Sequence, residues 1–270
     1  MARTLTGNNR RREQRLQEIM LARTSQQFER RLSREISRAM RAGATALDEG
    51  RVSPADQITS EHRQRLTRLM ENLWRASMTQ MAEHMTGSQR SWAGKIEAKN
   101  LSDVEPTEVV DRLMSAWMAD VGARKITQIT YTTKESIRTI IESGIQGGLS
   151  ERDIAKRIRE VAPTKSASRA QTIARTEVHA ASQVSAQDVA EASGLNMVRV
   201  WVSSQGERTR TIADGAQFDH LAAYGQRVGM NEPFVIEGAN GDEELMFPGD
   251  PMGSAGNVIN CRCAVVYELE

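Results

Sequence analysis

Aromatic residues and cysteine are scarce in this chain of 270 residues. Phe, Trp and Tyr make up 4% of it, and there are two cysteines, Cys261 and Cys263. Two cysteines make no disulfide framework, and their number is typical of a protein made in a reducing compartment. With so few aromatic residues beside 13 methionines, a core built from Leu, Ile, Met and Ala favours helices over sheets.

Long apolar runs are also missing. No charge-free stretch approaches the roughly 18–20 apolar residues that a membrane helix needs, and the first residues lack the apolar region of a secretory signal. The hydrophobic fraction of 39% and the charged fraction of 26% are those of a globular protein, which excludes a wholly disordered chain. We therefore expect a soluble protein made in a cytoplasm, with no membrane partner.

Glycine, proline and charge are unevenly distributed. Residues 201–270 hold nine of the 19 glycines and three of the six prolines, which predicts turns and short strands there. Residues 1–45 hold eleven arginines against four glutamates, a net charge of +7, whereas residues 201–270 have a net charge of −7. The two ends of the chain therefore differ in their expected roles.

The spacing of apolar residues predicts helices through most of the first 200 residues. Gly43 is expected to end the first helix, and Pro163 to separate the last two. The predicted helices cover residues 9–42, 60–87, 106–121, 124–143, 150–162 and 166–192. Alternating apolar residues and β-branched runs predict strands at 198–202, 234–236 and 263–267.

These elements predict an α+β fold: a mainly helical N-terminal body with long helices, followed by a small, glycine-rich α+β domain. We expect a basic N-terminal helical arm over residues 1–50 and a helical region over 51–122. The remaining part, 123–270, would combine helices to about residue 194 with a small β-rich module over 195–270.

Short motifs in the C-terminal half carry the most specific information. Ile-Ala-Arg-Thr-Glu at 173–177 lies in the last predicted helix, and Trp201 lies near the end of a predicted strand. The other motifs follow in order: Glu207-Arg208-Thr209-Arg210, Asp219-His220, Gly225-Gln226, Pro248-Gly249-Asp250-Pro251 and Asn260-Cys261-Arg262-Cys263. Each motif alone is weak, but their shared order and spacing over about residues 135–267 resemble the phage Mu F-like family of minor head, or head-morphogenesis, proteins.

The resemblance implies a structural virion component of a tailed bacteriophage, made in the host cytoplasm. Such a protein would join the procapsid with the portal protein and would act in capsid assembly, DNA packaging or DNA ejection. The scaffold or major capsid protein and double-stranded DNA, bound without sequence preference, are further partners to consider. Residues 1–120 show no motif of this family.

The cysteines allow two interpretations. Cys261, Cys263 and His220 are ligand types that suit zinc, with Asp214 or Asp219 as candidate oxygen ligands. However, the C-x-C spacing is tighter than in most structural zinc sites, and Val258-Ile259 stands where family members often carry His-Pro. The competing interpretation is a pair of small buried hydrophobic cysteines with no cofactor. A thiol nucleophile formed by Cys261 and His220 has no supporting sequence context.

The remaining motif residues are interpreted first as structural. Arg175 and Glu177 are two positions apart, so they cannot pair with each other on a helix and need partners elsewhere. Trp201, Arg208, Arg210, Asp219, Asn260 and Arg262 are predicted to brace loops, chiefly through arginine–carboxylate contacts. The functional alternative places Arg208 and Arg210 at a partner interface, where a guanidinium is a favourable contact group.

The N-terminal arginines suggest contact with DNA or with the portal. Basic clusters neutralise phosphates without reading sequence, although interspersed glutamates also fit a solvated helix face. The candidate contact residues are Arg10, Arg11, Arg12 and Arg15. A net charge of +1 for the whole chain argues against a dedicated DNA-binding protein.

An enzyme is the alternative to a head protein. A nuclease or transferase would use the Arg, His and Cys set of the C-terminal domain. Toxin domains appended to this family usually follow the Asn-Cys-Arg-Cys motif, and only residues 264–270 follow it here. The sequence therefore predicts no catalytic residues and no enzyme.

Overall fold

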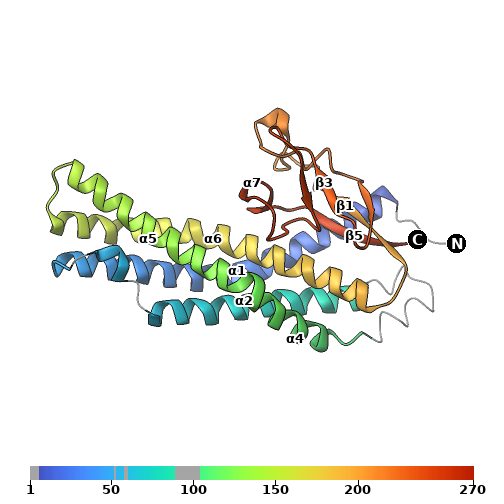
Figure 1. Cartoon of the computed structure of the whole chain (residues 1–270), viewed down its shortest axis with the longest axis horizontal. Coiled ribbons are helices and arrows are strands. Elements are labelled where there is room, and N and C mark those ends of the chain that lie inside the picture. The colour runs from blue at the N-terminus through green and yellow to red at the C-terminus, as the bar shows by residue number, and fades with distance from the viewer. Residues whose placement is uncertain (1–5, 52, 58–59, 89–103) are drawn as a thin grey trace. The chain divides into compact units, whose positions relative to one another are not determined.

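The computed structural model describes residues 6–51, 53–57, 60–88 and 104–270. The chain forms two compact units, each assembled from separated segments. Unit 1 comprises Met1–Thr24, Trp74–Met114 and Arg175–Glu270, and unit 2 comprises Ser25–Leu73 and Ser115–Ala174. Long helices precede a small region of strands, so the predicted α+β class is confirmed (Figure 1). The predicted segments 1–50, 51–122 and 123–270 do not coincide with these units, and as functional divisions they stay a prediction.

Helix α1 runs from Gly7 to Asp48, six residues beyond the predicted end at residue 42. Its apolar stripe is buried at Phe28, Leu32 and Ile36. Gly43 does not end the helix, because it is a packing residue: a Cβ atom there would lie 3.1 Å from Cδ1 of Ile137. Because glycine has no side chain, α1 can continue past this close contact. The sequence pattern alone does not distinguish such a packing glycine from one that ends a helix.

Helices α2 (Ser60–Ser88), α4 (Pro106–Trp117) and α5 (Ala123–Gln146) confirm the next three predictions. Between α4 and α5 the backbone does not break. A π-helical turn, η3 (Met118–Gly122), joins them. A short 3₁₀ turn, η1 (Pro54–Gln57), precedes α2. Among the described residues we find no helix with the continuous apolar length that a bilayer crossing requires.

The two helices predicted at 150–162 and 166–192 are one helix, α6, from Glu151 to Ala192. It begins as predicted at Ser150, whose Oγ accepts a hydrogen bond from the Asp153 backbone N–H at 3.2 Å, and Gly194 follows its end with a φ of 64°. Pro163 was expected to stop the helix because it lacks an N–H donor. Its neighbours Ala162 and Ser166 are fully buried, and this packing outweighs one lost hydrogen bond.

Unit 2 contains a buried ion cluster around Glu35. His62 Nδ1 lies 2.6 Å from Glu35 Oε1, and Arg65 Nε lies 2.9 Å from the same oxygen. Both His62 and Glu35 are buried. Burial lowers the pKa of His62, and the charges of Arg65 and Arg38 act in the same direction, against the opposing effect of Glu35.

This cluster predicts a pH dependence of stability. In the unfolded chain the His62 imidazole binds a proton near its ordinary pKa of about 6.5, while the folded protein resists protonation. The stabilisation that comes from keeping His62 neutral in the folded protein is complete above that pKa, and it is lost as the pH falls below it. We expect the free energy of unfolding, measured by urea titration, to decrease between about pH 7 and pH 5.5. His62→Gln should flatten this slope, and a slope equal to that of the wild type would contradict the assignment.

The C-terminal part of unit 1 contains two small sheets. In the first, β1 (Met197–Val202) lies between β2 (Arg227–Gly229) and β5 (Ala264–Leu269), and both pairings are antiparallel. In the second, β3 (Phe234–Ile236) pairs with β4 (Glu243–Leu245). Two short helical turns, η4 (Ile212–Asp214) and α7 (Ala255–Val258), lie in the connecting loops. Strands were predicted within one or two residues of β1, β3 and β5, and these predictions are confirmed.

Arg199 is a fully buried arginine at the centre of this sheet. Its guanidinium donates to the backbone carbonyls of Gly229, Glu232 and Met246, and to the Gln187 side chain on α6. It also lies 5.4 Å from the centre of the Phe234 ring. The end of β2, the loop between β2 and β3, and the residue after β4 are thus fixed to β1 by one side chain. Burial lowers the pKa of Arg199.

Strand β5 is an edge strand that helices cover. Gln17 of α1 donates to the Val265 carbonyl at 3.4 Å, and Gln183 of α6 accepts from the Val265 N–H at 3.2 Å. Gln183 also donates to Gln17 at 3.2 Å, which links the two amides. Side chains therefore occupy backbone groups that a neighbouring strand would otherwise bind.

The carboxylate of Glu268 on β5 is fully buried and lies between two arginines. Arg10 of α1 donates to both of its oxygens, at 2.5 and 3.0 Å, and Arg227 of β2 lies 2.6 Å from Oε2. A buried charge requires such partners. Arg10, predicted to contact DNA or the portal, is therefore a structural residue that joins α1 to the sheet.

Candidate functional site

The two most specific motifs meet at Asn260. This residue, between α7 and β5, has a φ of 60°, a left-handed conformation that asparagine tolerates better than most residues. Its side-chain Oδ1 accepts from Arg175 of α6 at 3.1 Å, and its backbone N–H donates to Thr176 Oγ1 at 3.1 Å. The Arg-Thr pair on α6 thus holds the turn that precedes Cys261.

Glu177, the last residue of the same α6 motif, is also structural. It is buried, and its Oε2 accepts from the indole Nε1 of Trp74 on α2 at 3.2 Å. The prediction that Arg175 and Glu177 have separate partners is confirmed.

Cys261, Cys263 and His220 form a buried cluster, the arrangement that the zinc interpretation of these residues requires. His220 Nδ1 lies 3.6 Å from the Cys261 sulfur and 3.5 Å from the Cys263 sulfur. The three ligand atoms all lie within 4.8 Å of one another. The side chains come from the loop between η4 and β2 and from the segment leading into β5, so the cluster joins two distant parts of the module.

The His220 ring is held by hydrogen bonds on its other side. Its Nε2 lies 2.8 Å from Asn257 Oδ1, and the Asn257 amide donates to Glu243. Because that amide donates to a carboxylate, its oxygen is the atom that faces His220. Nε2 is then the donor, and Nδ1 presents a lone pair to the two sulfurs. Trp201 packs edge-on against the same ring, with 5.6 Å between ring centres.

The two thiols influence each other's ionisation. The neighbouring Cys263, together with the imidazoles of His179 and His220, lowers the pKa of the Cys261 thiol well below its ordinary value despite burial. The pKa of Cys263 rises well above its ordinary value because Cys261 lies beside it and burial disfavours a second charge. Of the two thiols, Cys261 is therefore the one that loses its proton first, and its charge opposes ionisation of Cys263.

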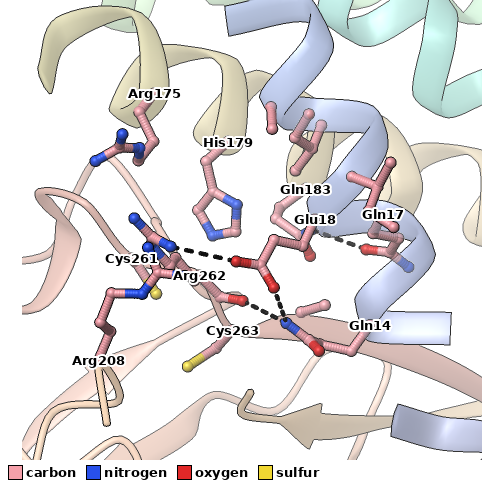
Figure 2. Close-up of a pocket in the computed structure, with 14 residues that line it drawn as sticks. Gln14, Gln17, Glu18, Arg175, His179, Gln183, Arg208, Cys261, Arg262 and Cys263 are labelled. Carbon is pink, nitrogen blue, oxygen red and sulfur yellow. Dashed lines mark hydrogen bonds and ion pairs between the residues drawn. The ribbon is translucent and has the colours of Figure 1, made fainter. Parts of the chain in front are cut away.

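His179 is a residue of this site that the sequence analysis missed. It lies on α6, four residues after Arg175, is 4% exposed, and its Nε2 has no hydrogen-bond partner among the described residues. Figure 2 shows its ring pointing from α6 toward the segment that carries Cys261. Only four histidines occur in the chain, and the position of His179 two residues after the Arg-Thr-Glu motif was the available signal.

A cavity of about 340 Å³ opens beside the cluster, within unit 1. Arg175, Arg208 and Arg262 line it, and Arg262 forms an ion pair with Glu18 of α1 at 3.4 Å (Figure 2). Burial, followed by the charges of Arg208 and Arg175, lowers the pKa of Arg262. Arg262 is thus close enough to both other guanidiniums for their charges to oppose its own, while Glu18 is its carboxylate partner.

The remaining loop residues bind backbone atoms rather than each other. Arg210 donates to the carbonyls of Asn257 and Ile259. Asp219 accepts from the backbone N–H groups of Leu221 and Ala222 at 3.0 and 2.8 Å. The predicted arginine–carboxylate network is therefore wrong for this pair, since each residue satisfies main-chain groups of a turn.

Neither aspartate considered as an oxygen ligand for zinc joins the cluster. Asp219 caps the turn described above, and Asp214 accepts from the hydroxyl of Thr211 at 2.6 Å. The group of candidate ligand atoms within 4.8 Å includes neither.

The N-terminal arginines other than Arg10 are exposed. Arg11 donates to Gln205 at 3.2 Å and to Asn8 at 2.8 Å, and Arg12 and Arg15 face solvent. Gln205 lies three residues before Arg208, and Arg11 lies three residues before Gln14 on α1; Arg208 and Gln14 both line the cavity. We call Arg11, Arg208 and Arg262 the arginine rim.

Comparison with known proteins gives two matches. Residues 135–266 match a family described as "Phage Mu protein F like protein". The chain is also similar to "Uncharacterized protein YqbB" of Bacillus subtilis (strain 168), with 27% identity over 160 residues. That alignment covers 59% of this chain and 50% of the relative, so the chain spans about half the length of the curated relative that it matches. No solved structure matches the chain.

Proposed function

Because the C-terminal half of this chain, residues 135–266, belongs to the phage Mu protein F-like family, we propose that the protein is a minor head protein of a tailed bacteriophage that joins the procapsid by binding the portal protein. The family is one of phage head-morphogenesis proteins, which supports a place in the virion. The family match carries the proposal, and the geometry of the motifs is consistent with it.

The motif residues support an assembly role because most of them brace the fold. Arg175 and Thr176 hold Asn260, Glu177 binds Trp74, and Arg210 holds two carbonyls. Residues committed to such contacts are not available to bind a substrate. What they produce is a rigid module that presents a defined surface.

The arginine rim is the surface we propose for the portal contact. Arg208 is exposed and makes no hydrogen bond or ion pair within the described residues. Arg11 is also exposed and donates to Gln205, three residues earlier in the same loop. The apolar side chains of Ile19, Leu21 and Ala22 also line the cavity. Guanidiniums around an apolar patch are typical of protein–protein contacts, whereas a DNA-binding surface consists mainly of phosphate contacts. The rim therefore favours acidic side chains of a protein partner.

Charge reversal at the rim tests this proposal. Co-expressed with the portal protein of the same phage, the wild-type chain should co-purify with portal rings. Arg11→Glu combined with Arg208→Glu should weaken that binding at least about tenfold, because like charges would then face each other. Arg152→Glu with Arg157→Glu, two exposed arginines of α6 in unit 2, is the matched control and should bind as wild type.

DNA retention is measured in parallel on the same variants. If the rim variant binds portal rings normally but loses retention of a double-stranded DNA fragment at low salt, the contact is with packaged DNA instead. If the wild-type chain does not bind portal rings, the portal assignment is wrong.

An enzyme is the second candidate function, and one observation favours it. A thiol whose pKa is lowered beside two imidazoles is also the arrangement of a cysteine nucleophile. Against this, Cys261 is 4% exposed, and a nucleophile must reach its substrate. The metal-binding experiment below discriminates between the two roles of this thiol.

A further inference from the structure

We propose that unit 1 binds one zinc ion through four side chains: His179, His220, Cys261 and Cys263. This site does not depend on the proposed portal contact. The ligands come from α6, from the loop between η4 and β2, and from the segment leading into β5. One ion would therefore fasten the glycine-rich module to the long helix behind it.

The distances within the cluster fit a tetrahedral ion. Zinc binds sulfur at about 2.3 Å and imidazole nitrogen at about 2.0–2.1 Å, so a tetrahedral angle places nitrogen and sulfur about 3.5 Å apart. His220 Nδ1 lies 3.6 and 3.5 Å from the two sulfurs. One imidazole nitrogen equidistant from two sulfurs is the expected geometry of three ligands around a shared centre.

The partners of His220 also fit a metal ligand. A zinc-bound imidazole commonly donates its second N–H to an oxygen that fixes the ring and its tautomer. Asn257 Oδ1 is that acceptor at 2.8 Å, and Glu243 orients the Asn257 amide. The lone pair of Nδ1 consequently faces the sulfurs, as ligation requires.

His179 supplies the fourth ligand. Its Nε2 is buried without a hydrogen-bond partner in the described part of the chain, and its ring points from α6 toward the segment that carries Cys261 (Figure 2). It lies outside the group of atoms within 4.8 Å, so ligation needs the side chain to rotate toward the cluster. Gly249, with a φ of 81°, leaves space for the ring, since a Cβ there would be 2.6 Å from His179 Cδ2.

The surroundings indicate a structural site rather than a catalytic one. Cys261, Cys263 and His220 are 4%, 3% and 2% exposed, and four protein ligands leave no position for a substrate or water. An ion bound by the folded chain alone stabilises it, because the unfolded chain offers no preformed site. Zinc would supplement the small core that a module of about seventy residues can form.

The test begins with the wild-type full-length chain. Protein purified without chelating steps should contain about one zinc per chain by elemental analysis. After metal removal, titration with Co²⁺ should produce sulfur-to-cobalt charge-transfer absorption and the visible bands of a tetrahedral site. A folded wild-type chain that holds no stoichiometric zinc and gives no such absorption would overturn the proposal without reference to any variant.

The variants then identify the ligands. Cys261→Ser, Cys263→Ser and His220→Asn should each lose stoichiometric metal, while His84→Asn, a histidine elsewhere in unit 1, should retain it. Asn257→Ala should weaken zinc binding about 10- to 100-fold, because it removes the group that orients His220. A His179→Asn protein that binds zinc as tightly as wild type would overturn the assignment of the fourth ligand.

Alkylation separates the ligand role from the nucleophile role. In the zinc-loaded protein, iodoacetamide should leave both thiols unmodified, and metal removal should expose them. Rapid modification of Cys261 in the zinc-loaded protein would overturn the proposed site and favour a thiol nucleophile.

Discussion

Replacing Arg199 by methionine should lower the free energy of unfolding by at least about 3 kcal/mol. The substitution removes the donors for the carbonyls of Gly229, Glu232 and Met246, and a buried acceptor left without its partner costs about 1–3 kcal/mol. It also removes the contact with the Phe234 ring. Burying an arginine costs free energy. In this fold, however, the surrounding backbone carbonyls are arranged around the guanidinium and lose their hydrogen bonds without it.

Urea denaturation followed by circular dichroism measures this effect. Arg199→Lys should recover only part of the stability, because an ammonium cannot present the planar fork that reaches several carbonyls at once. Arg152→Met, at an exposed position of α6, serves as the control and should stay within about 0.5 kcal/mol of wild type. If Arg199→Met unfolds at the wild-type urea concentration, the guanidinium is not the group that holds these loops.

Arg10→Ala should destabilise the protein by roughly 2–3 kcal/mol, whereas Arg11→Ala and Arg12→Ala should change its stability little. Removing one partner of a buried ion pair leaves a charge without compensation. Here Glu268 is fully buried and keeps Arg227 as a second partner, so the cost is below that of a complete loss. Of these three consecutive arginines, Arg10 is therefore expected to be structural, whereas Arg11 and Arg12 are expected to be surface residues.

Thermal unfolding of the three variants provides the comparison. Replacing Glu268 by glutamine in the Arg10→Ala background should restore part of the stability, since the uncompensated charge is then gone. Three equal melting temperatures would show that Arg10 is a surface residue, as the sequence analysis proposed, and would return it to the candidate DNA or portal contacts.

The sequence predicted the elements of this fold better than their junctions. Apolar spacing located the long helices, and alternation located β1, β3 and β5. The errors occurred at Gly43 and Pro163, where local preference indicates a stop but tertiary packing continues the helix. A single sequence shows that glycine and proline tend to end helices. It does not show which distant residue packs against them and keeps the helix continuous.

The candidate site was predicted in the same partial way. Residue types identified Cys261, Cys263 and His220, which the structure brings together. His179 was missed because it lies about 80 residues from the cysteines within an otherwise ordinary helix. Arg199 was missed because an arginine between valines in a strand is usually solvent-facing on an alternating pattern. Both depend on contacts between segments that are far apart in the chain.

The glutamine pair at Val265 bears on how copies of this protein can assemble. Open strand edges allow chains to join by extending a common sheet, and Gln17 with Gln183 blocks this route along β5 at Val265. On the opposite side, β2 offers an edge of three residues. If copies of this chain associate, β5 is therefore expected to contribute through side-chain contacts and not by extending a shared sheet, which is the route to irreversible aggregation.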